Sequence, residues 1–355
     1  MNIHDLVDFL KNYDGESIRI MEVCGSHTAA ITKSGLKSII SPKIQLISGP
    51  GCPVCVTPSA YIDRLIELSK TENTCIVTFG DLMRVPGSKS SLNLEKGNGA
   101  NVKMVYSPMD IIKMAEDNPD INYVFAAVGF ETTIPVYTLL LESLISKDIK
   151  NVKLLTALKT MPEAIEYLIQ AGAKIDGFIA PGHVSVITGK NAFYGLASTY
   201  NIPFGITGFN PSELVIGIYG ITKMICEKEK LKEKNIVPLK NFYTSVVRDE
   251  GNDTALNLMK KYLQPYDAVW RGMGEIKGSG LKIKDEYSFF DAGSEGLSED
   301  IKLNKGCSCD KVLTGKITPH ECPLFKKVCT PLTPQGACMV SEEGCCFQTF
   351  LSEPQ

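Results

Sequence analysis

Two cysteines, Cys52 and Cys55, stand in a loop rich in glycine and proline, Ser48-Gly49-Pro50-Gly51-Cys52-Pro53-Val54-Cys55-Val56-Thr57-Pro58. Such a loop restricts the backbone and is suited to holding two thiols still. Apolar residues at helical spacing follow it, which predicts a helix with Thr57 as N-cap and Pro58 at its first position. A helix N-terminus or a Cys-x-x-Cys motif lowers a thiol pKa from ~8.5 into the range of roughly 3.5 to 7.5. The pair is therefore a candidate nucleophile, redox couple or soft-metal site, with a chance pair in a tight turn as the alternative.

The C-terminal segment is a second concentration of thiols, because seven of the twelve cysteines fall in the last 49 residues. Four of them stand at wide, irregular spacing: Cys322, Cys329, Cys338 and Cys346. Four thiolates suit tetrahedral zinc or a [4Fe-4S] cluster, and the absence of closely paired cysteines among these four favours the cluster. Redox-active thiols are a third possibility. Cys307, Cys309 and Cys345 remain available for redox exchange or for ligation.

Three further turns carry side chains suited to chemistry. Cys24 and His27 lie in the turn after one predicted strand, Glu131 follows another, and His183 a third. Ligands bind at the C-terminal edge of open α/β sheets, so these four residues and the Cys52/Cys55 pair are expected to converge in one cleft. The alternative for each histidine is a hydrogen bond within its own turn. For Glu131 the alternative is a cap on the following helix.

The elements that must position these residues alternate between strands and helices over about 200 residues. This alternation predicts an α/β fold: two doubly wound, Rossmann-like halves with mostly parallel sheets, followed by a C-terminal cysteine-rich iron-sulfur domain. The expected domains are residues 1–115 with the Cys24 and Cys52/Cys55 turns, 116–240 with the Glu131 and His183 turns, and 241–355 with the cysteine-rich tail. Cys75 is expected to be a buried strand residue, and Trp270 a packing anchor between the tail and the α/β body.

The bulk composition excludes several classes of function. The 355 residues carry a formal charge of -3 and show no long block of Lys or Arg, so we expect no nucleic-acid partner. No apolar run is long enough to span a membrane, and the N-terminus lacks the pattern of a signal peptide. The expected location is the cytoplasm, where twelve cysteines indicate metal or redox chemistry rather than disulfides.

The motifs and their order resemble those of one known family. The turns Met21-Glu22-Val23-Cys24-Gly25-Ser26-His27, Gly49-Pro50-Gly51-Cys52-Pro53-Val54-Cys55, Gly129-Phe130-Glu131-Thr132-Thr133 and Pro181-Gly182-His183-Val184-Ser185 are similar to those of HypD, the hydrogenase maturation family. The tail, from Cys322-Pro323-Leu324-Phe325 to Gly336-Ala337-Cys338-Met339-Val340-Ser341, is similar as well. The likeness runs from about residue 18 to the C-terminus.

The resemblance implies a scaffold that assembles the Fe(CN)2CO moiety of [NiFe] hydrogenases together with two partners, HypC, which shares the iron, and HypE, which delivers cyanide. It implies that Cys24 binds this iron, that His27 is its neighbour, and that Cys52 and Cys55 form a redox pair nearby. It also implies a [4Fe-4S] cluster on Cys322, Cys329, Cys338 and Cys346. Thiolates are the soft donors that such an iron requires.

A working hypothesis is that electrons pass from the cluster through Cys52 and Cys55 to iron at Cys24. Two other classes of function remain open. One is a cluster-linked thiol-disulfide oxidoreductase, and the other is an α/β binding module with a structural zinc tail. Metal analysis and disulfide-reductase turnover would separate them.

Overall fold

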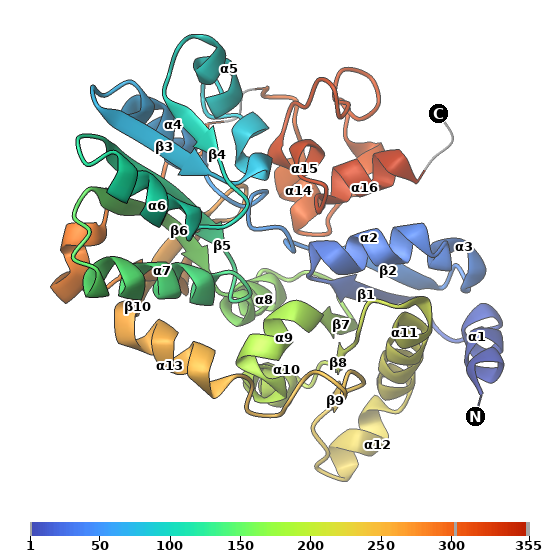
Figure 1. Cartoon of the computed structure of the whole chain (residues 1–355). Helices are drawn as coiled ribbons and strands as arrows, with labels where there is room; N and C mark the ends of the chain where they lie inside the picture. Colours follow the sequence, from blue (N-terminus) through green and yellow to red (C-terminus); the bar gives the residue numbers. More distant parts are fainter. Residues whose placement is uncertain (1, 302–303, 353–355) are drawn as a thin grey trace.

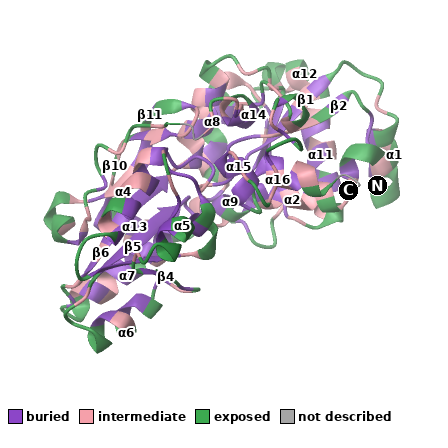
Figure 2. Ribbon diagram, turned by 90° about the horizontal axis from the view of Figure 1, so that it is seen from above, coloured by how far each residue is buried: buried purple, intermediate pink, exposed green. Residues whose placement is uncertain are grey.

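The computed structural model describes residues 2–301 and 304–352. Within these residues the chain forms two mostly parallel sheets flanked by helices, with the cysteine-rich tail packed beside them (Figure 1). This confirms the predicted α/β class. Purple, buried residues follow the strands and line the junctions between elements, whereas the outer helix faces are exposed (Figure 2).

The first sheet carries most of the predicted site. Its strand order is β2-β1-β7-β8-β9, and all neighbours are parallel. The strands are β1 (Ile18–Glu22), β2 (Ile44–Ser48), β7 (Gly177–Ala180), β8 (Phe204–Ile206) and β9 (Leu239–Asn241). Ile20 pairs with Leu46 on one side and with Gly177 on the other, so the turns after β1, β2 and β7 leave the sheet at one edge.

The second sheet has the order β10-β11-β6-β5-β3-β4. Its strands are β3 (Thr74–Thr78), β4 (Val102–Met104), β5 (Asn122–Gly129), β6 (Val152–Lys159), β10 (Leu263–Trp270) and β11 (Gly274–Ile283). The strands from β6 to β4 are parallel, whereas β10 and β11 form an antiparallel hairpin added at the edge of β6. Cys75 is fully buried in β3, as predicted.

The chain passes between the two sheets instead of completing one before the other. β1 and β2 belong to the first sheet, β3–β6 to the second, β7–β9 to the first again, and β10–β11 to the second. The expected domain boundary at residues 115 and 116 therefore does not follow the sheets. The alternation of strand and helix predicts parallel pairing, but it does not specify which neighbour each strand selects.

The helices cover the sheets and fix the ends of the functional turns. They are α1 (Ile3–Lys11), α2 (Gly25–Lys33), α3 (Leu36–Ile39), α4 (Ser59–Ser69), η1 (Gly80–Arg84), α5 (Leu92–Gly97), α6 (Asp110–Asp117), α7 (Ile134–Ser146), α8 (Met161–Gln170), α9 (Gly182–Thr188), η2 (Lys190–Phe193), α10 (Tyr194–Tyr200), α11 (Pro211–Cys226), α12 (Lys228–Glu233), α13 (Asp253–Tyr262) and η3 (Asp285–Phe290). α2 and α3 are separate helices, because Gly35 between them adopts a left-handed φ of 65°. Pro58, rather than Thr57, is the N-cap of α4.

The tail contains short helices joined by turns: α14 (Cys309–Leu313), η4 (Pro319–Glu321), α15 (Ala337–Val340) and α16 (Cys345–Leu351). It lies beside α2 and close to the second sheet (Figure 1). Trp270 is fully buried; its ring stacks on Phe130 at 5.7 Å between centroids, and its indole nitrogen donates to Ser279. Gly272, two residues later, lies against the tail residue Asp310, as expected of an anchor at this junction.

Candidate functional site

Cys24 is held against the loop that carries Cys52 and Cys55. It is the N-cap of α2, and the next amide, that of Gly25, donates a 3.0 Å hydrogen bond to the carbonyl of Gly51. A Cβ atom on Gly51 would lie 2.6 Å from the Cα and 2.7 Å from the carbonyl carbon of Cys24. The two turns expected to converge are therefore in direct backbone contact.

Carboxyl groups surround the Cys24 thiol. Glu22 accepts a 3.1 Å hydrogen bond from the Cys24 amide and another from the Thr28 hydroxyl, and burial raises the pKa of Glu22 to about 8. Burial also raises the pKa of the Cys24 thiol to about 12, and the negative charges of Glu22 and Glu343 raise it further. Hydrogen bonds from the amides of His27 and Ser26 lower this pKa but do not offset the effect of burial. The metal-free protein therefore holds a protonated thiol here, and a metal cation would displace the proton.

His27 presents one unpartnered nitrogen in the same turn. Its Nε2 lies 3.1 Å from the carbonyl of Thr207 and 3.2 Å from that of Gly208, so Nε2 must carry the hydrogen. Nδ1 therefore has a free lone pair, and it is buried without a hydrogen-bond partner. Burial lowers the pKa of His27 to about 4, which keeps the ring neutral near pH 7. A neutral imidazole nitrogen is a metal ligand or a hydrogen-bond acceptor.

An aromatic stack joins the two histidines of the predicted site. The ring of Phe209 lies 4.5 Å from that of His27 and 4.1 Å from that of His183, measured between centroids. Phe209 follows β8, the strand next to the one that precedes His183. The structure thus brings His183 to the Cys24 turn, as predicted.

A glutamate from the tail completes this group. The Ser26 hydroxyl donates a 3.1 Å hydrogen bond to Glu343, and its oxygen lies 3.5 Å from Nδ1 of His183. A Cβ on Gly25 would lie 2.7 Å from the carbonyl oxygen of Glu343, so the tail packs directly on the start of α2. Sequence reasoning missed Glu343, Glu22 and Phe209. The one sequence signal for Glu343 is its position between two tail cysteines.

Cys52 and Cys55 form a close dithiol. Their sulfur atoms lie 2.7 Å apart, and the amide of Cys55 donates a 3.2 Å hydrogen bond to the sulfur of Cys52. Burial raises the pKa of Cys52 well above its usual value. Burial opposes the Cys55 thiolate as well, but hydrogen bonds from Cys338 and Cys52 outweigh it and lower the pKa of Cys55 to about 7. The expected lowering of a thiol pKa thus occurs at Cys55 and not at Cys52. Hydrogen bonds from other thiols cause it.

Cys55 connects this pair to the thiols of the tail. Its thiol contacts Cys338 and the carbonyl of Ala337, the latter at 3.7 Å. Cys338 in turn hydrogen-bonds with three further tail thiols, those of Cys309, Cys345 and Cys346. The thiols therefore form a continuous group that links the front loop to the C-terminal segment.

The four predicted cluster ligands, Cys322, Cys329, Cys338 and Cys346, are all buried in this region as free thiols. The three thiols without an assigned role lie among them. Cys309 contacts Cys338 and Cys346, and its sulfur is 3.2 Å from that of Cys307. A Cβ on Gly336 would lie 2.7 Å from both sulfur atoms, so this glycine makes room for them.

The tail offers seven buried thiols in one region, a donor set of the kind that zinc or an iron-sulfur cluster binds. Hydrogen bonds from neighbouring thiols hold the pKa of Cys309 and that of Cys345 well below the usual value, whereas such hydrogen bonds raise the pKa of the predicted ligands Cys338 and Cys346. Easily ionised thiols are the ligands that iron and zinc require. Within the described residues, no three Cys, His, Asp or Glu side chains are arranged to hold a single metal ion. A four-iron cluster needs ligands spaced around a larger core.

Glu131 enters from the second sheet, where it follows β5. Its carboxylate accepts a 2.8 Å hydrogen bond from the amide of Met161, so it caps α8 and not the following helix α7. The other carboxylate oxygen is buried without a partner, and burial raises the pKa of Glu131 to about 8, with a further rise from Glu163. In the described structure no hydrogen bond or ion pair joins Glu131 to Cys24, His27 or His183.

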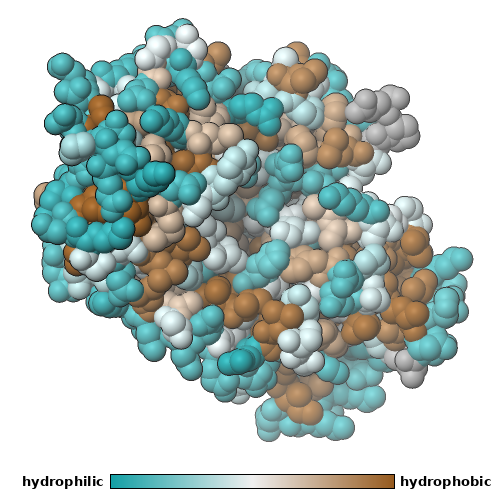
Figure 3. Space-filling model, viewed as in Figure 1, coloured by the Kyte–Doolittle hydropathy of each residue, from teal (hydrophilic) through white to brown (hydrophobic). Residues whose placement is uncertain are grey.

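The visible surface shows no single dominant apolar patch. Figure 3 shows hydrophilic residues over much of this face, with hydrophobic residues in several separate groups. None of the helices in the described ranges is long and apolar enough to cross a membrane.

The family model HypD, described as the hydrogenase formation hypA family, matches residues 2–352 of this chain. A putative hydrogenase expression/formation protein of Methanocaldococcus jannaschii is 40% identical over 333 residues, which cover 93% of this chain and 91% of the relative. The hydrogenase maturation factor HypD of Escherichia coli is 39% identical over 336 residues, covering 93% of this chain and 87% of the relative. That of Rhodobacter capsulatus is 39% identical over 337 residues, covering 93% and 88%.

Proposed function

This chain belongs to the HypD family of hydrogenase maturation factors, and from that premise we propose that it is the scaffold on which the Fe(CN)2CO moiety of [NiFe] hydrogenases is assembled. The observation that carries the proposal is the backbone contact between the Cys24 turn and the Cys52/Cys55 loop. It places one iron-binding thiol beside a dithiol that can supply electrons. The free state of the described cysteines supports work in the cytoplasm.

Cys24 supplies the thiolate for the iron, which is the cargo of the scaffold. A ferrous ion that carries cyanide and carbonyl is electron-rich and prefers a soft sulfur donor. The unpartnered Nδ1 of His27 offers a second ligand or a hydrogen-bond acceptor in the same turn. HypC, which shares the iron, and HypE, which delivers cyanide, are the partners that this role requires.

The tail thiols Cys322, Cys329, Cys338 and Cys346 would hold a [4Fe-4S] cluster, which would supply one electron at a time. Conversion of the Cys52/Cys55 dithiol to a disulfide releases two electrons and two protons. The dithiol would thus be a donor of two electrons and two protons held beside Cys24. Such a cluster would supply one-electron chemistry next to this dithiol, because Cys338 contacts Cys55.

The test is infrared spectroscopy on anaerobic protein co-purified with its HypC partner, together with iron and sulfide analysis. We expect cyanide and carbonyl bands in the wild type. Cys24→Ala should remove these bands and leave the iron and sulfide of the tail unchanged. Wild-type protein without such bands would refute the scaffold role, and loss of both signals in Cys24→Ala would show that the two sites are not separable.

A thiol-disulfide oxidoreductase is the second candidate function, favoured by the 2.7 Å separation of the Cys52 and Cys55 sulfur atoms. It predicts turnover with a general disulfide substrate and no need for a HypC partner. Disulfide reduction at the same rate in Cys24→Ala as in the wild type, without infrared bands in either protein, would favour this reading over the scaffold.

A further inference from the structure

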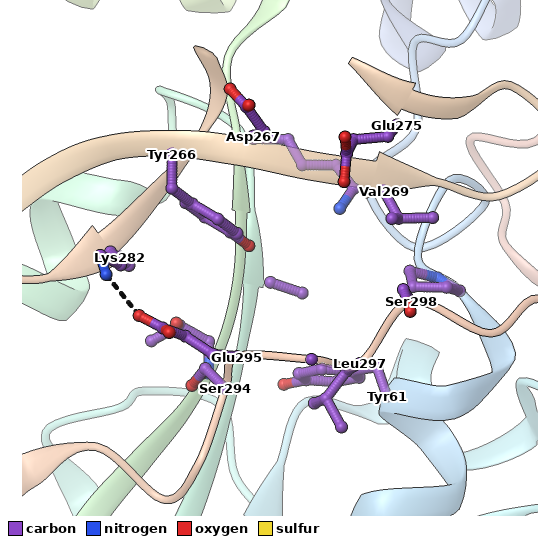
Figure 4. A pocket seen from close by; sticks show the side chains of 15 residues that line it. Tyr61, Tyr266, Asp267, Val269, Glu275, Lys282, Ser294, Glu295, Leu297 and Ser298 are labelled. Atoms are coloured by element: carbon purple, nitrogen blue, oxygen red, sulfur yellow. Dashed lines mark hydrogen bonds and ion pairs between the residues drawn. The ribbon is translucent and has the colours of Figure 1, made fainter. Parts of the chain in front are cut away.

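A pocket of about 330 Å³ lies away from the thiols, on the second sheet. The end of β6, the β10–β11 hairpin, the start of α4 and the segment 294–298 form its walls (Figure 4). Its volume falls at the lower end of the range for small-molecule sites, roughly 300 to 1,000 Å³. Neither the proposed iron site nor the thiol group uses these residues.

Lys159 is the charged group in the interior of this pocket. The residue is 2% exposed, and it lines the pocket at the C-terminal end of β6. Its ammonium lies 5.7 Å from the ring centroid of Trp270, but none of the described residues gives it a carboxylate or a hydrogen-bond acceptor. Burial lowers the pKa of Lys159 to about 7. A buried amine without a partner is costly, and an anion bound beside it removes that cost.

A tyrosine hydroxyl provides a second donor. Tyr266 directs its hydroxyl end toward the interior of the pocket in Figure 4. Burial raises the pKa of Tyr266 to about 12, and the charges of Glu295 and Asp291 raise it further. The hydroxyl therefore stays protonated near neutral pH and can donate a hydrogen bond to an acceptor. An ammonium and a hydroxyl together suit the two oxygens of a carboxylate.

The rest of the lining limits the charge that the pocket accepts. Glu295 is paired with Lys282, so that pair adds no net charge. Asp267 and Glu275 lie on the hairpin at the wall of the pocket and add negative charge. These carboxylates oppose an anion of charge two or more, such as a phosphate or a dicarboxylate. One negative charge is compensated inside, and further charges are repelled.

We propose that this pocket binds a small organic monocarboxylate, with its carboxylate group on the Lys159 ammonium and the Tyr266 hydroxyl. The apolar part of the ligand lies against Tyr61, Val269 and Leu297, which line the same pocket. This site is independent of the proposed iron site, so each proposal can fail without the other.

The intrinsic fluorescence of the protein offers a direct test, because Trp270 is the only tryptophan and lies beside Lys159. Sodium butanoate is titrated into the full-length protein near neutral pH, with calorimetry as a second readout. Inorganic phosphate and succinate are titrated at the same ionic strength. We expect saturable binding of butanoate and binding of the other two that is at least about tenfold weaker.

Lys159→Met keeps the length of the side chain and removes the charge, so it should weaken butanoate binding at least about tenfold. Tyr266→Phe keeps the ring and should weaken it by about threefold or more. Lys153→Met is the matched control, since it removes a lysine from the same strand outside the pocket. Its affinity for butanoate should stay within about twofold of the wild-type value. Circular dichroism and thermal unfolding confirm that each variant is folded.

Three results would overturn the proposal. The first is the absence of saturable butanoate binding by both fluorescence and calorimetry. The second is equal butanoate affinity in wild type and in folded Lys159→Met. The third is tighter binding of phosphate or succinate than of butanoate, which would indicate a site for multiply charged anions.

Discussion

Gly51 lies so close to Cys24 that there is no space between them for a side chain. This contact fixes the position of the loop that carries Cys52 and Cys55 relative to the thiol proposed to bind iron. It is also the contact on which the proposed function depends most directly.

Gly51→Ala should therefore disturb both stability and iron binding. The added methyl group would lie 2.6 Å from the Cα of Cys24, and overpacking of this kind costs about 1–3 kcal/mol. Urea unfolding of metal-free protein measures the loss. Gly97→Ala is the control, because a Cβ at the end of α5 meets no atom within 4 Å and should stabilise the protein by about 0.5 kcal/mol. Equal unfolding midpoints in the two variants would contradict this view of the contact.

The buried carboxyl of Glu131 should make stability fall as pH rises. Burial raises the pKa of Glu131 to about 8, so the folded state binds this proton more tightly than the unfolded state does. The cost of ionisation grows above the unfolded pKa of ~4.3 and is complete above the folded value. Relative to wild type, Glu131→Gln should gain up to about 4 kcal/mol between about pH 5 and pH 8.

A surface glutamate provides the contrast for this experiment. A hydrogen bond from Lys261 lowers the pKa of Glu142, so Glu142 stabilises the fold at neutral pH and this contribution is lost as pH falls. This loss occurs below the unfolded pKa of ~4.3, so the difference between Glu142→Gln and wild type in urea unfolding should stay constant from pH 5 to pH 8. The same trend in both variants would show that burial of Glu131 is not the cause.

Glu343 should control the acidity of Cys24 across the junction between tail and sheet. Its negative charge raises the pKa of the Cys24 thiol, so Glu343→Gln should lower that pKa. The rate of iodoacetamide labelling at Cys24, followed by peptide mass spectrometry in metal-free protein, should rise at a lower pH. Glu342→Gln removes the same charge one residue earlier and should leave the labelling profile unchanged. Identical profiles for the two variants would rule out a direct effect of Glu343.

Because Cys55 contacts Cys338, replacing Cys55 should slow assembly of the iron complex and leave the tail cluster intact. Cys55→Ala removes one thiol of the proposed relay and leaves the tail cysteines in place. The iron and sulfide content should match wild type, whereas the cyanide and carbonyl infrared bands should appear at least about tenfold more slowly. Cys226→Ala, at an exposed cysteine, should match wild type in both measurements. If Cys322→Ala lacks the cluster and still assembles the iron complex at the wild-type rate, the proposed electron transfer from the tail is wrong.

Much of the fold was predictable because strands and helices have local signals. The apolar run of β5 and the amphipathic spacing in α4 follow from side-chain burial, and α4 lies where it was expected. The passage of the chain between two sheets was not predictable. It depends on which strands pair over long distances, as Ile20 does with Gly177, and no local pattern encodes that choice.

The candidate site was predictable where it lies in unusual turns. The Cys24, Cys52/Cys55 and His183 turns follow β1, β2 and β7 and share one sheet edge, which the strand order places side by side. Glu131 ends a strand of the other sheet, so the strand order of the first sheet does not place it beside these turns. Glu343 and Phe209 enter through tertiary packing, which leaves no mark at their own positions in the sequence.

The order in which the strands join the two sheets determines when each strand can pair during synthesis. During synthesis, Ile20 leaves the ribosome on the order of ten seconds before its partner Gly177, at ~5–20 residues per second. The nascent chain therefore carries β1 with one edge open until β7 emerges. Nascent-chain profiling should therefore detect native-like protection of β1 only in chains that include β7.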